Sequence, residues 1–266
     1  MRKLFPKVAY IKKQMNERHF EEFYNKNSSD VYYKFTYHLE KQLEGIDLKG
    51  KNVLEVGCGK GFVSFWIALF GEARKVVALD ESEGVGSEKG VLAFLEKSVK
   101  DFNIKLTLAN SKIKMEKERL ENIKVVKCDI MNNSFPNDSF DIIIANNALH
   151  HVVRTGKYIL EDLTTKNKWI NLFCELKRLL KPNGMIVLGE FSRKSIWRYI
   201  KLRYRQIDWE LHPTLNEWLL IIKLAGFKEI SFKYIVPYKL RHLRPLLSNS
   251  TSSFFISPIF NIYAKK

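Results

Sequence analysis

The sequence predicts an α/β fold, a mostly parallel sheet of seven strands with helices on both faces. Short, continuously apolar segments alternate with helical patterns through the middle of the 266-residue chain, which favours parallel strands buried on both sides. Three glycines follow the first apolar segment, where a strand would give way to a helix. The last two strand patterns follow one another without a predicted helix between them, which indicates an antiparallel edge to the sheet.

Seven segments have strand patterns. The first five are continuously apolar, and the sixth alternates between apolar and polar residues with period two. They span 52–56, 75–80, 123–129, 140–146, 185–190, 229–236 and 258–265. The serine-rich stretch 248–253 is expected to be the loop between the last two strands.

Helical spacing and end signals predict the connecting helices. An apolar helix is expected to end at Phe70, and an amphipathic helix lies within 167–184. Thr214 and Glu217 have the spacing of a capping box, which opens a helix by satisfying backbone N–H groups reciprocally. Further helical patterns span 30–45, 91–102 and 110–122.

Composition sets limits on location and partners. Forty-five basic residues against 29 acidic ones give a net charge of +16, so either an anionic partner or a plain bias toward Lys, Ile and Asn explains the charge. No signal peptide or transmembrane segment is expected, because no uncharged apolar run approaches the roughly 18 residues of a membrane span. The three cysteines are far apart, so neither disulfides nor zinc is expected, and the expected location is cytoplasmic.

The glycine-rich turn points to a nucleoside ligand. Gly57, Gly59 and Gly61 lie where backbone can approach a ligand closely at the carboxyl end of the first strand. Asp80 ends the second strand, where an acidic side chain can accept hydrogen bonds from ribose hydroxyls. The GxGxG spacing and the preceding Glu55 disfavour a pyrophosphate and suit a ligand with a positive amino group.

Five stretches, read together, resemble the class I S-adenosylmethionine-dependent methyltransferases. They are VLEVGCGKG, VVALDES, VVKCDI, FPNDSFDIIIANNALHHV and ELKRLLKPNGMIVLGEF, and they match in order and in relation to the strands over about residues 50–190. The resemblance implies a Rossmann-like sheet, S-adenosylmethionine as cofactor and methyl transfer as the reaction.

The same resemblance implies residue roles in cofactor binding. The three glycines would pass beneath the methionine part, with Cys58 a small filler inside the turn, and Asp80 would bind the ribose. Glu55 would lie near the amino group, unless it is only a solvated carboxylate at the end of a strand. Asn146 would face the methyl group or the methionine end of the cofactor.

Four residues are candidates for the adenine side of the cofactor. Glu81 or Ser82 would lie beside the adenine, Asp129 would accept a hydrogen bond from its amino group, and Ile130 would pack nearby. Asp129 could instead be a plain helix cap. Two long connections, at 81–122 and 152–167, depart from the usual family pattern and bear on the assignment of Glu81.

Three residues are candidate bases for an acceptor that must lose a proton. His150 and His151 follow the fourth strand, and Glu190 ends the fifth, so all three lie at carboxyl ends of strands. The histidine pair is also a common pattern among family members with different acceptors, so it need not be catalytic. No cluster of metal ligands is evident in the sequence.

The expected acceptor is a small molecule or a lipid, methylated at oxygen or nitrogen. Residues 146–149 lack the Asn/Asp-Pro-Pro-aromatic motif of enzymes that methylate exocyclic amines of bases. The basic and aromatic segment after the fifth strand could bind nucleic acid, lie on an anionic membrane, or simply cap the pocket. An RNA methyltransferase and a cofactor-binding subunit without activity remain the alternatives, and the oligomeric state is open.

The chain is expected to have two parts. Residues 1–46 would form an N-terminal helical extension that caps the fold, and residues 47–266 would form the methyltransferase domain. Within that domain, 191–212 would be a lid insertion.

Overall fold

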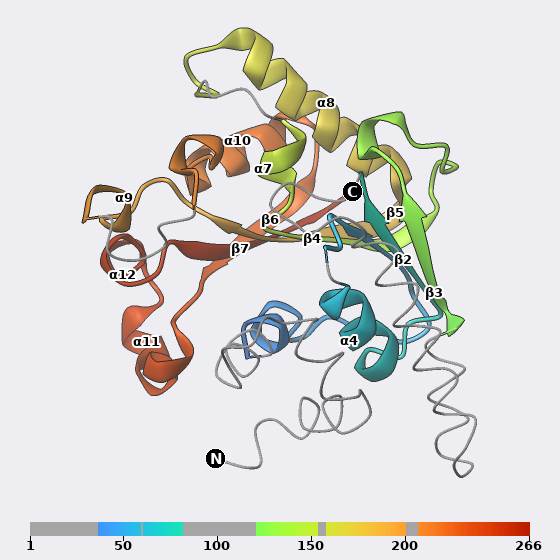
Figure 1. The fold of residues 1–266 in the computed structure, drawn as a ribbon, viewed down its shortest axis with the longest axis horizontal. Helices are drawn as coiled ribbons and strands as arrows, with labels where there is room; N and C mark the ends of the chain where they lie inside the picture. Colours follow the sequence, from blue (N-terminus) through green and yellow to red (C-terminus); the bar gives the residue numbers. More distant parts are fainter. Residues whose placement is uncertain (1–36, 60, 82–120, 154–157, 201–206) are drawn as a thin grey trace.

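Figure 1 presents the fold as a computed structural model, which describes residues 37–59, 61–81, 121–153, 158–200 and 207–266. A seven-stranded sheet runs through it in the order β3-β2-β1-β4-β5-β7-β6. The strands are β1 (Asn52–Val56), β2 (Lys75–Asp80), β3 (Ile123–Lys127), β4 (Phe140–Asn146), β5 (Leu180–Phe191), β6 (Lys228–Tyr234) and β7 (Ile259–Lys265). The first five strands pair in parallel, while β7 is antiparallel to both of its neighbours. The predicted fold class is confirmed.

Helices cover both faces of this sheet (Figure 1). One face packs against α4 and the helical residues 37–42, and the other against α8 and α10. The longer helices are α4 (Phe62–Phe70), α8 (Leu163–Leu179) and α10 (Leu215–Leu224). The short ones are η1 (Ile130–Asn132), α7 (Leu149–Val152), α9 (Trp197–Ile200), η2 (Trp209–Leu211), η3 (Tyr238–Leu243), α11 (Arg244–Leu247) and α12 (Ser250–Phe255).

Alternation along the strands divides the core in two. In β1, Val53 packs into the core on the α4 face, whereas Leu54 and Val56 pack into the core on the α8 and α10 face, because successive side chains of a strand point to opposite faces. The larger core joins α8 to α10 through Trp169 and Trp218, whose rings meet edge to face at 4.8 Å. These buried aromatics fix α10, and with it the segment that precedes it, against the sheet.

The capping box at the start of α10 forms as predicted. Thr214 accepts a hydrogen bond from the backbone N–H of Glu217, and the Glu217 carboxylate accepts one from the backbone N–H of Thr214 at 2.7 Å. The same carboxylate forms a buried ion pair with Arg193 at 2.5 Å. The helix start is thereby tied to the segment that follows β5.

Two details of the C-terminal region differ from the prediction. The serine-rich stretch 248–253 is not a plain loop, since α12 begins at Ser250 after Asn249, whose side chain accepts from the backbone N–H of Ser252. A capping Asn outweighs the weak helix propensity of serine over so short a helix. The C-terminal strand β7 also lies inside the sheet, so that β6 forms the edge.

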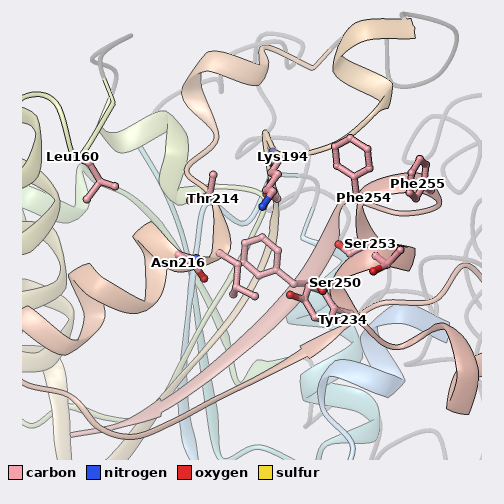
Figure 2. Close-up of a pocket in the computed structure, with 13 residues that line it drawn as sticks. Leu160, Lys194, Thr214, Asn216, Tyr234, Ser250, Ser253, Phe254 and Phe255 are labelled. Atoms are coloured by element: carbon pink, nitrogen blue, oxygen red, sulfur yellow. Dashed lines mark hydrogen bonds between the residues drawn. The ribbon is translucent and has the colours of Figure 1, made fainter.

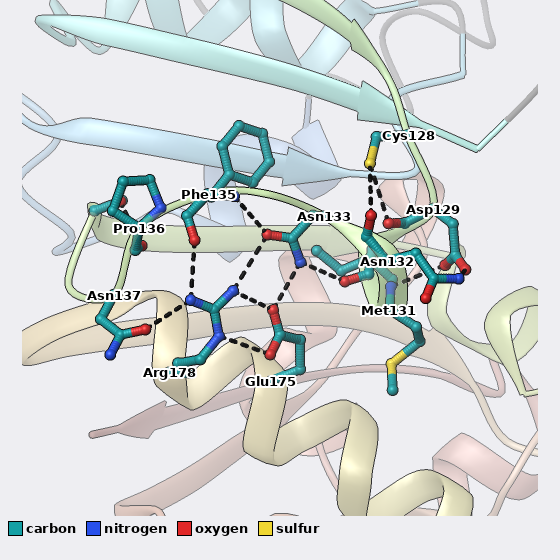
Figure 3. Close-up of polar contacts among 12 residues, drawn as sticks. Cys128, Asp129, Met131, Asn132, Asn133, Phe135, Pro136, Asn137, Glu175 and Arg178 are labelled. Atoms are coloured by element: carbon teal, nitrogen blue, oxygen red, sulfur yellow. Dashed lines mark hydrogen bonds and ion pairs between the residues drawn. The ribbon is translucent and has the colours of Figure 1, made fainter.

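The loop between β3 and β4 is held by one arginine of α8. Figure 3 shows the guanidinium of Arg178 between Glu175, the carbonyl of Phe135 and the side chains of Asn133 and Asn137. All of these contacts are 2.6–3.3 Å long. The network holds the carboxyl-end loop of β3 against α8, and so fixes the place of η1.

Several predictions fall outside the described residues. The N-terminal extension is described only from residue 37, and the helical patterns at 91–102 and 110–120 are not covered. The lid segment 191–212 is described except for 201–206. The division into extension, domain and lid therefore stays a proposal.

Candidate active site

The glycine turn between β1 and α4 has left-handed backbone at each predicted glycine. Gly57, Gly59 and Gly61 have φ angles of 70°, 48° and 74°, a region that side chains with a Cβ rarely occupy. The N–H groups of Gly57 and Cys58 both donate to the carbonyl of Leu79 in β2. The turn is therefore fastened to the neighbouring strand and bends back over the carboxyl edge of the sheet.

Space around the turn differs from one glycine to the next. A Cβ added at Gly57 would stand 2.3 Å from the Cβ of Ala148, so only glycine fits there. A Cβ added at Gly59 would meet no atom of the described residues within 4 Å. Bare backbone with open space beside it is what a closely bound ligand needs.

Asp80 is joined directly to this turn. Its Oδ2 atom accepts a hydrogen bond from the backbone N–H of Gly59 at 3.0 Å. The second strand thus ends with a half-buried carboxylate at the open side of the turn. This is the position expected of a residue that binds ribose hydroxyls.

Glu55 lies beneath the turn on the α4 face of the sheet. It is buried, and its carboxylate accepts a hydrogen bond from the Ser64 hydroxyl of α4. Burial raises the pKa of Glu55 to about 8, because a carboxylate is poorly solvated there. The alternative of a solvated carboxylate does not hold, and a cationic group nearby would favour the charged form.

Cys58 is buried within the turn. Its pKa is raised, first by burial and then by the carboxylates of Glu55 and Asp80. The raised pKa keeps the thiol protonated, whereas the thiolate is the nucleophilic form. Cys58 therefore suits the role of a small residue that fills the turn.

The residues assigned to the adenine side differ in their contacts and in their burial. Asp129 is the N-cap of η1, and its carboxylate accepts from the backbone N–H of Met131 and from the side chain of Asn132, as Figure 3 shows. Oδ1 caps the backbone of η1, and Oδ2 accepts from the Asn132 side chain. The helix cap is the alternative role expected for this residue. Ile130 is buried in the core on the α8 face, whereas Glu81 is exposed.

Asn146, at the end of β4, meets a residue that sequence reasoning missed. Its Oδ1 accepts a hydrogen bond from Gln42 Nε2 at 2.6 Å. A Cβ at Gly189 would come within 2.5 Å of that same oxygen, so β5 leaves room for the contact. Gln42 is buried, and its backbone carbonyl accepts a hydrogen bond from the Tyr263 hydroxyl. The segment before β1 therefore reaches the carboxyl edge of the sheet.

The three candidate bases gather at the ends of β4 and β5. His150 Nδ1 lies 3.0 Å from Glu190 Oε2, and both side chains are buried. The other oxygen of Glu190 accepts from the backbone N–H of Leu149. His151 is less buried, and its ring lies tilted against that of His150, with ring centroids 4.0 Å apart. The structure thus brings together the residues predicted for proton transfer.

A third histidine, His212, completes this cluster. Its Nδ1 lies 3.9 Å from Glu190 Oε2, and its ring centroid lies 3.9 Å from that of His150. Burial lowers the pKa of His212 to about 3, with smaller contributions from His150 and His151, so its ring is neutral at physiological pH. In the sequence, His212 is notable only for lying just before the capping box. No pattern in the sequence connects it with Glu190.

The same cluster has the donor types of a metal centre. His150, Glu190 and His212 each offer a ligand atom, and these atoms lie within 4.8 Å of one another. Two imidazoles and a carboxylate form a donor set known from zinc sites. Such a group was not predictable from the sequence, because its members come from three separate segments.

Comparison with known proteins relates this site to one family. A family model described as a methyltransferase domain matches residues 103–219. The chain is 28% identical over 188 residues to sterol 24-C-methyltransferase ERG6B of Gibberella zeae, covering 67% of this chain and 40% of that protein. A solved S-adenosylmethionine-dependent methyltransferase from Aquifex aeolicus superposes with a TM-score of 0.55 at 19% identity, over 85% of this chain and 88% of the other.

Residues 103–219 thus match a methyltransferase domain, and the chain shares its fold with S-adenosylmethionine-dependent methyltransferases. Two more structures share the fold of this methyltransferase. One is an S-adenosylmethionine-dependent methyltransferase from Mesorhizobium loti, with a TM-score of 0.53, 21% identity, and 86% and 96% of the two chains covered. The other is phosphoethanolamine N-methyltransferase 2 of Haemonchus contortus in complex with phosphomonomethylethanolamine and S-adenosylhomocysteine, with a TM-score of 0.56, 16% identity, and 93% and 56% covered.

The residues of this methyltransferase fit its cofactor, S-adenosylmethionine. Open space beside Gly59 admits a ligand, Asp80 stands at its edge, and the desolvated carboxyl of Glu55 lies below. The chain spans 40% of the length of the sterol methyltransferase it matches. Within the described residues, no helix of this methyltransferase is both long enough and apolar enough to cross a membrane.

Proposed function

We propose that this chain transfers the methyl group of S-adenosylmethionine to an oxygen or nitrogen atom of a small-molecule or lipid acceptor. The 3.0 Å contact between His150 Nδ1 and Glu190 Oε2, at the carboxyl ends of adjacent strands, carries the proposal. The sterol and phosphoethanolamine methyltransferases among the similar proteins support an acceptor of this class.

The cofactor, when bound, supplies an activated methyl group on a sulfonium. We infer that the glycine turn and Asp80 hold the cofactor, with Glu55 near its amino group and Asn146 near the reacting end. Orientation alone can lower much of the barrier to such a displacement. Of the remaining cofactor assignments, Cys58 and Ile130 would serve by packing, and Asp129 and Glu81 would border the adenine side.

His150 is the proposed base. Glu190 accepts a hydrogen bond from the Nδ1–H group of His150. The Nε2 lone pair is then free to take the proton of an acceptor hydroxyl or ammonium. The buried carboxylate then stabilises the imidazolium that forms, as an orienting acid does in hydrolytic triads. His151, whose ring lies against that of His150, would line the space where the methyl acceptor binds.

An RNA acceptor has less support from the described part of the lid. Arg193 pairs with Glu217 and lies over the ring of Tyr158, and Arg198 pairs with Glu210. Arginines engaged in internal contacts have fewer donors left for phosphate. Arg193 instead braces the lid segment against α10, and Arg198 joins two parts of the lid segment to each other.

A label-transfer assay tests the proposal. The protein is incubated with methyl-labelled S-adenosylmethionine and cell extract, and label is counted in lipid, small-molecule, RNA and protein fractions. We expect label in the lipid or small-molecule fraction, and a loss of roughly a hundredfold or more in His150→Asn. Label in RNA, with nucleic acid co-purifying by absorbance, would support the alternative acceptor. Cofactor binding with no label transferred to any fraction would favour a subunit without activity.

A further inference from the structure

A pocket of about 540 Å³ opens beside the histidine cluster, beyond the ends of β5 and β7. Its volume is typical of sites that bind small molecules. Figure 2 shows its walls, which come from the segment after β5, the start of α10, the end of β6 and α12.

The pocket adjoins the cluster through backbone connections. Phe260, in its wall, is the β7 partner of Glu190 in β5. Ser192 and Thr214, which also line it, follow Glu190 and His212 by two residues each. The pocket therefore lies next to the cluster, at the carboxyl end of β5.

The lid segment and α12 are joined where they form the pocket wall. The backbone N–H of Ile196 and the hydroxyl of Ser195 both donate to the carbonyl of Phe254, at 3.0 and 3.2 Å. Ser192 donates its N–H to the carbonyl of Pro258. These bonds make the wall a built feature of the fold.

The lining combines an apolar half with a polar half. Phe254, Phe255 and Leu160 give it apolar surface, and Leu160 and Phe255 are 69% and 51% exposed. Ser250 and Thr251 add hydroxyl groups. Large apolar side chains left open to water at a pocket favour a ligand with an apolar part.

One charge dominates the lining. Among the described residues that line the pocket, Lys194 is the single ionic side chain and none is Asp or Glu. Among the residues that the structure describes, Lys194 has no ion-pair partner, unlike Arg193 and Arg198 nearby. In Figure 2 its side chain lies between Thr214 and Phe254, among the other lining residues. A cation with no carboxylate near it attracts an anionic group.

We propose that this pocket binds the methyl acceptor and that the acceptor is an amphiphile whose single anionic group, a carboxylate or a phosphate, pairs with Lys194. This inference rests on the proposed methyl transfer and adds the chemistry of the substrate. The apolar part would lie against Phe254 and Phe255, and the acceptor atom would face the histidine cluster.

Calorimetric titration of the full chain with octyl phosphate, octanoate and 1-octanol, without cofactor, tests the inference. We expect at least one anionic ligand to bind more tightly than 1-octanol. Lys194→Met should weaken that ligand roughly three- to tenfold and leave 1-octanol unchanged. The control Lys228→Met, at the far end of β6, should change neither affinity. Phe255→Ala should weaken all three octyl ligands.

Four results would overturn the inference. They are absence of binding by all octyl ligands, equal affinity of Lys194→Met and the parent for the anionic octyl ligand that binds, inorganic phosphate binding as tightly as octyl phosphate, and, when vesicles are titrated in parallel, binding only to vesicles that contain phosphatidic acid. Because these titrations need no turnover, a failed label transfer with intact amphiphile binding would count against the methyl-transfer proposal alone.

Discussion

The backbone N–H of Gly59 donates to the carboxylate of Asp80 over 3.0 Å, so the glycine turn and the end of the second strand form one unit. A ligand held by the turn must also meet this carboxylate. The pairing explains why the two motifs, separated in the chain by a whole helix, act at one place.

Close packing at Gly57 predicts a position-specific loss of stability. Gly57→Ala would place a Cβ 2.3 Å from Ala148, whereas Gly45→Ala, also at positive φ, would meet nothing within 4 Å. Both variants carry the left-handed cost of about 1–2 kcal/mol, and Gly57→Ala should lose about 1–3 kcal/mol more through overpacking. Denaturant unfolding measures both. Equal losses of unfolding free energy in the two variants would mean that Ala148 moves away from the new Cβ without destabilising the fold.

The His150–Glu190 pair predicts a defect in rate without a defect in cofactor binding. Glu190→Gln should lower kcat roughly tenfold to a hundredfold, because the amide stabilises an imidazolium poorly. Affinity for S-adenosylhomocysteine and the melting temperature should stay close to those of the control Glu229→Gln, an exposed residue of β6. Full activity in Glu190→Gln would remove this carboxylate from the mechanism.

Burial of Glu55 predicts a pH-dependent stability. Its pKa is about 8 in the folded state against 4.5 for an exposed Glu, so between these pH values the folded chain holds a proton that the unfolded chain has released. The free energy of unfolding should therefore fall as pH rises from 4.5 to 8, by at most about 1.4 kcal/mol per pH unit. Glu55→Gln should show a shallower dependence. Parallel curves for the two proteins would show that Glu55 is charged throughout.

Methyl transfer is expected to need no metal ion. His150 and Glu190 make a direct hydrogen bond, and this contact alone can orient the base. Dialysis against EDTA should leave label transfer unchanged. A loss restored by zinc would instead assign His150, Glu190 and His212 to a metal centre, and His212→Ala would then lose the restored activity.

The fold and the turn were predictable because their signals are local. The apolar strand of Val53 and Leu54, the spacing of the glycines and the capping box at Thr214 each depend on neighbours in sequence. Gln42 and His212 were missed because their partners, Asn146 and Glu190, are brought to them only by the assembled sheet. Asp129 shows the converse, since its hydrogen bonds to Met131 and Asn132 are local and its place before a short helix was enough to predict a cap.

Calorimetric titration with S-adenosylhomocysteine tests the cofactor site most directly. The parent should bind, Gly59→Arg should lose binding because its side chain fills the open space, and Asp80→Ala should weaken it by roughly tenfold. Gly45→Arg, at a turn with similar φ and equally open space, should bind as the parent does. Unchanged affinity in both Gly59→Arg and Asp80→Ala would contradict a cofactor held between the turn and the second strand.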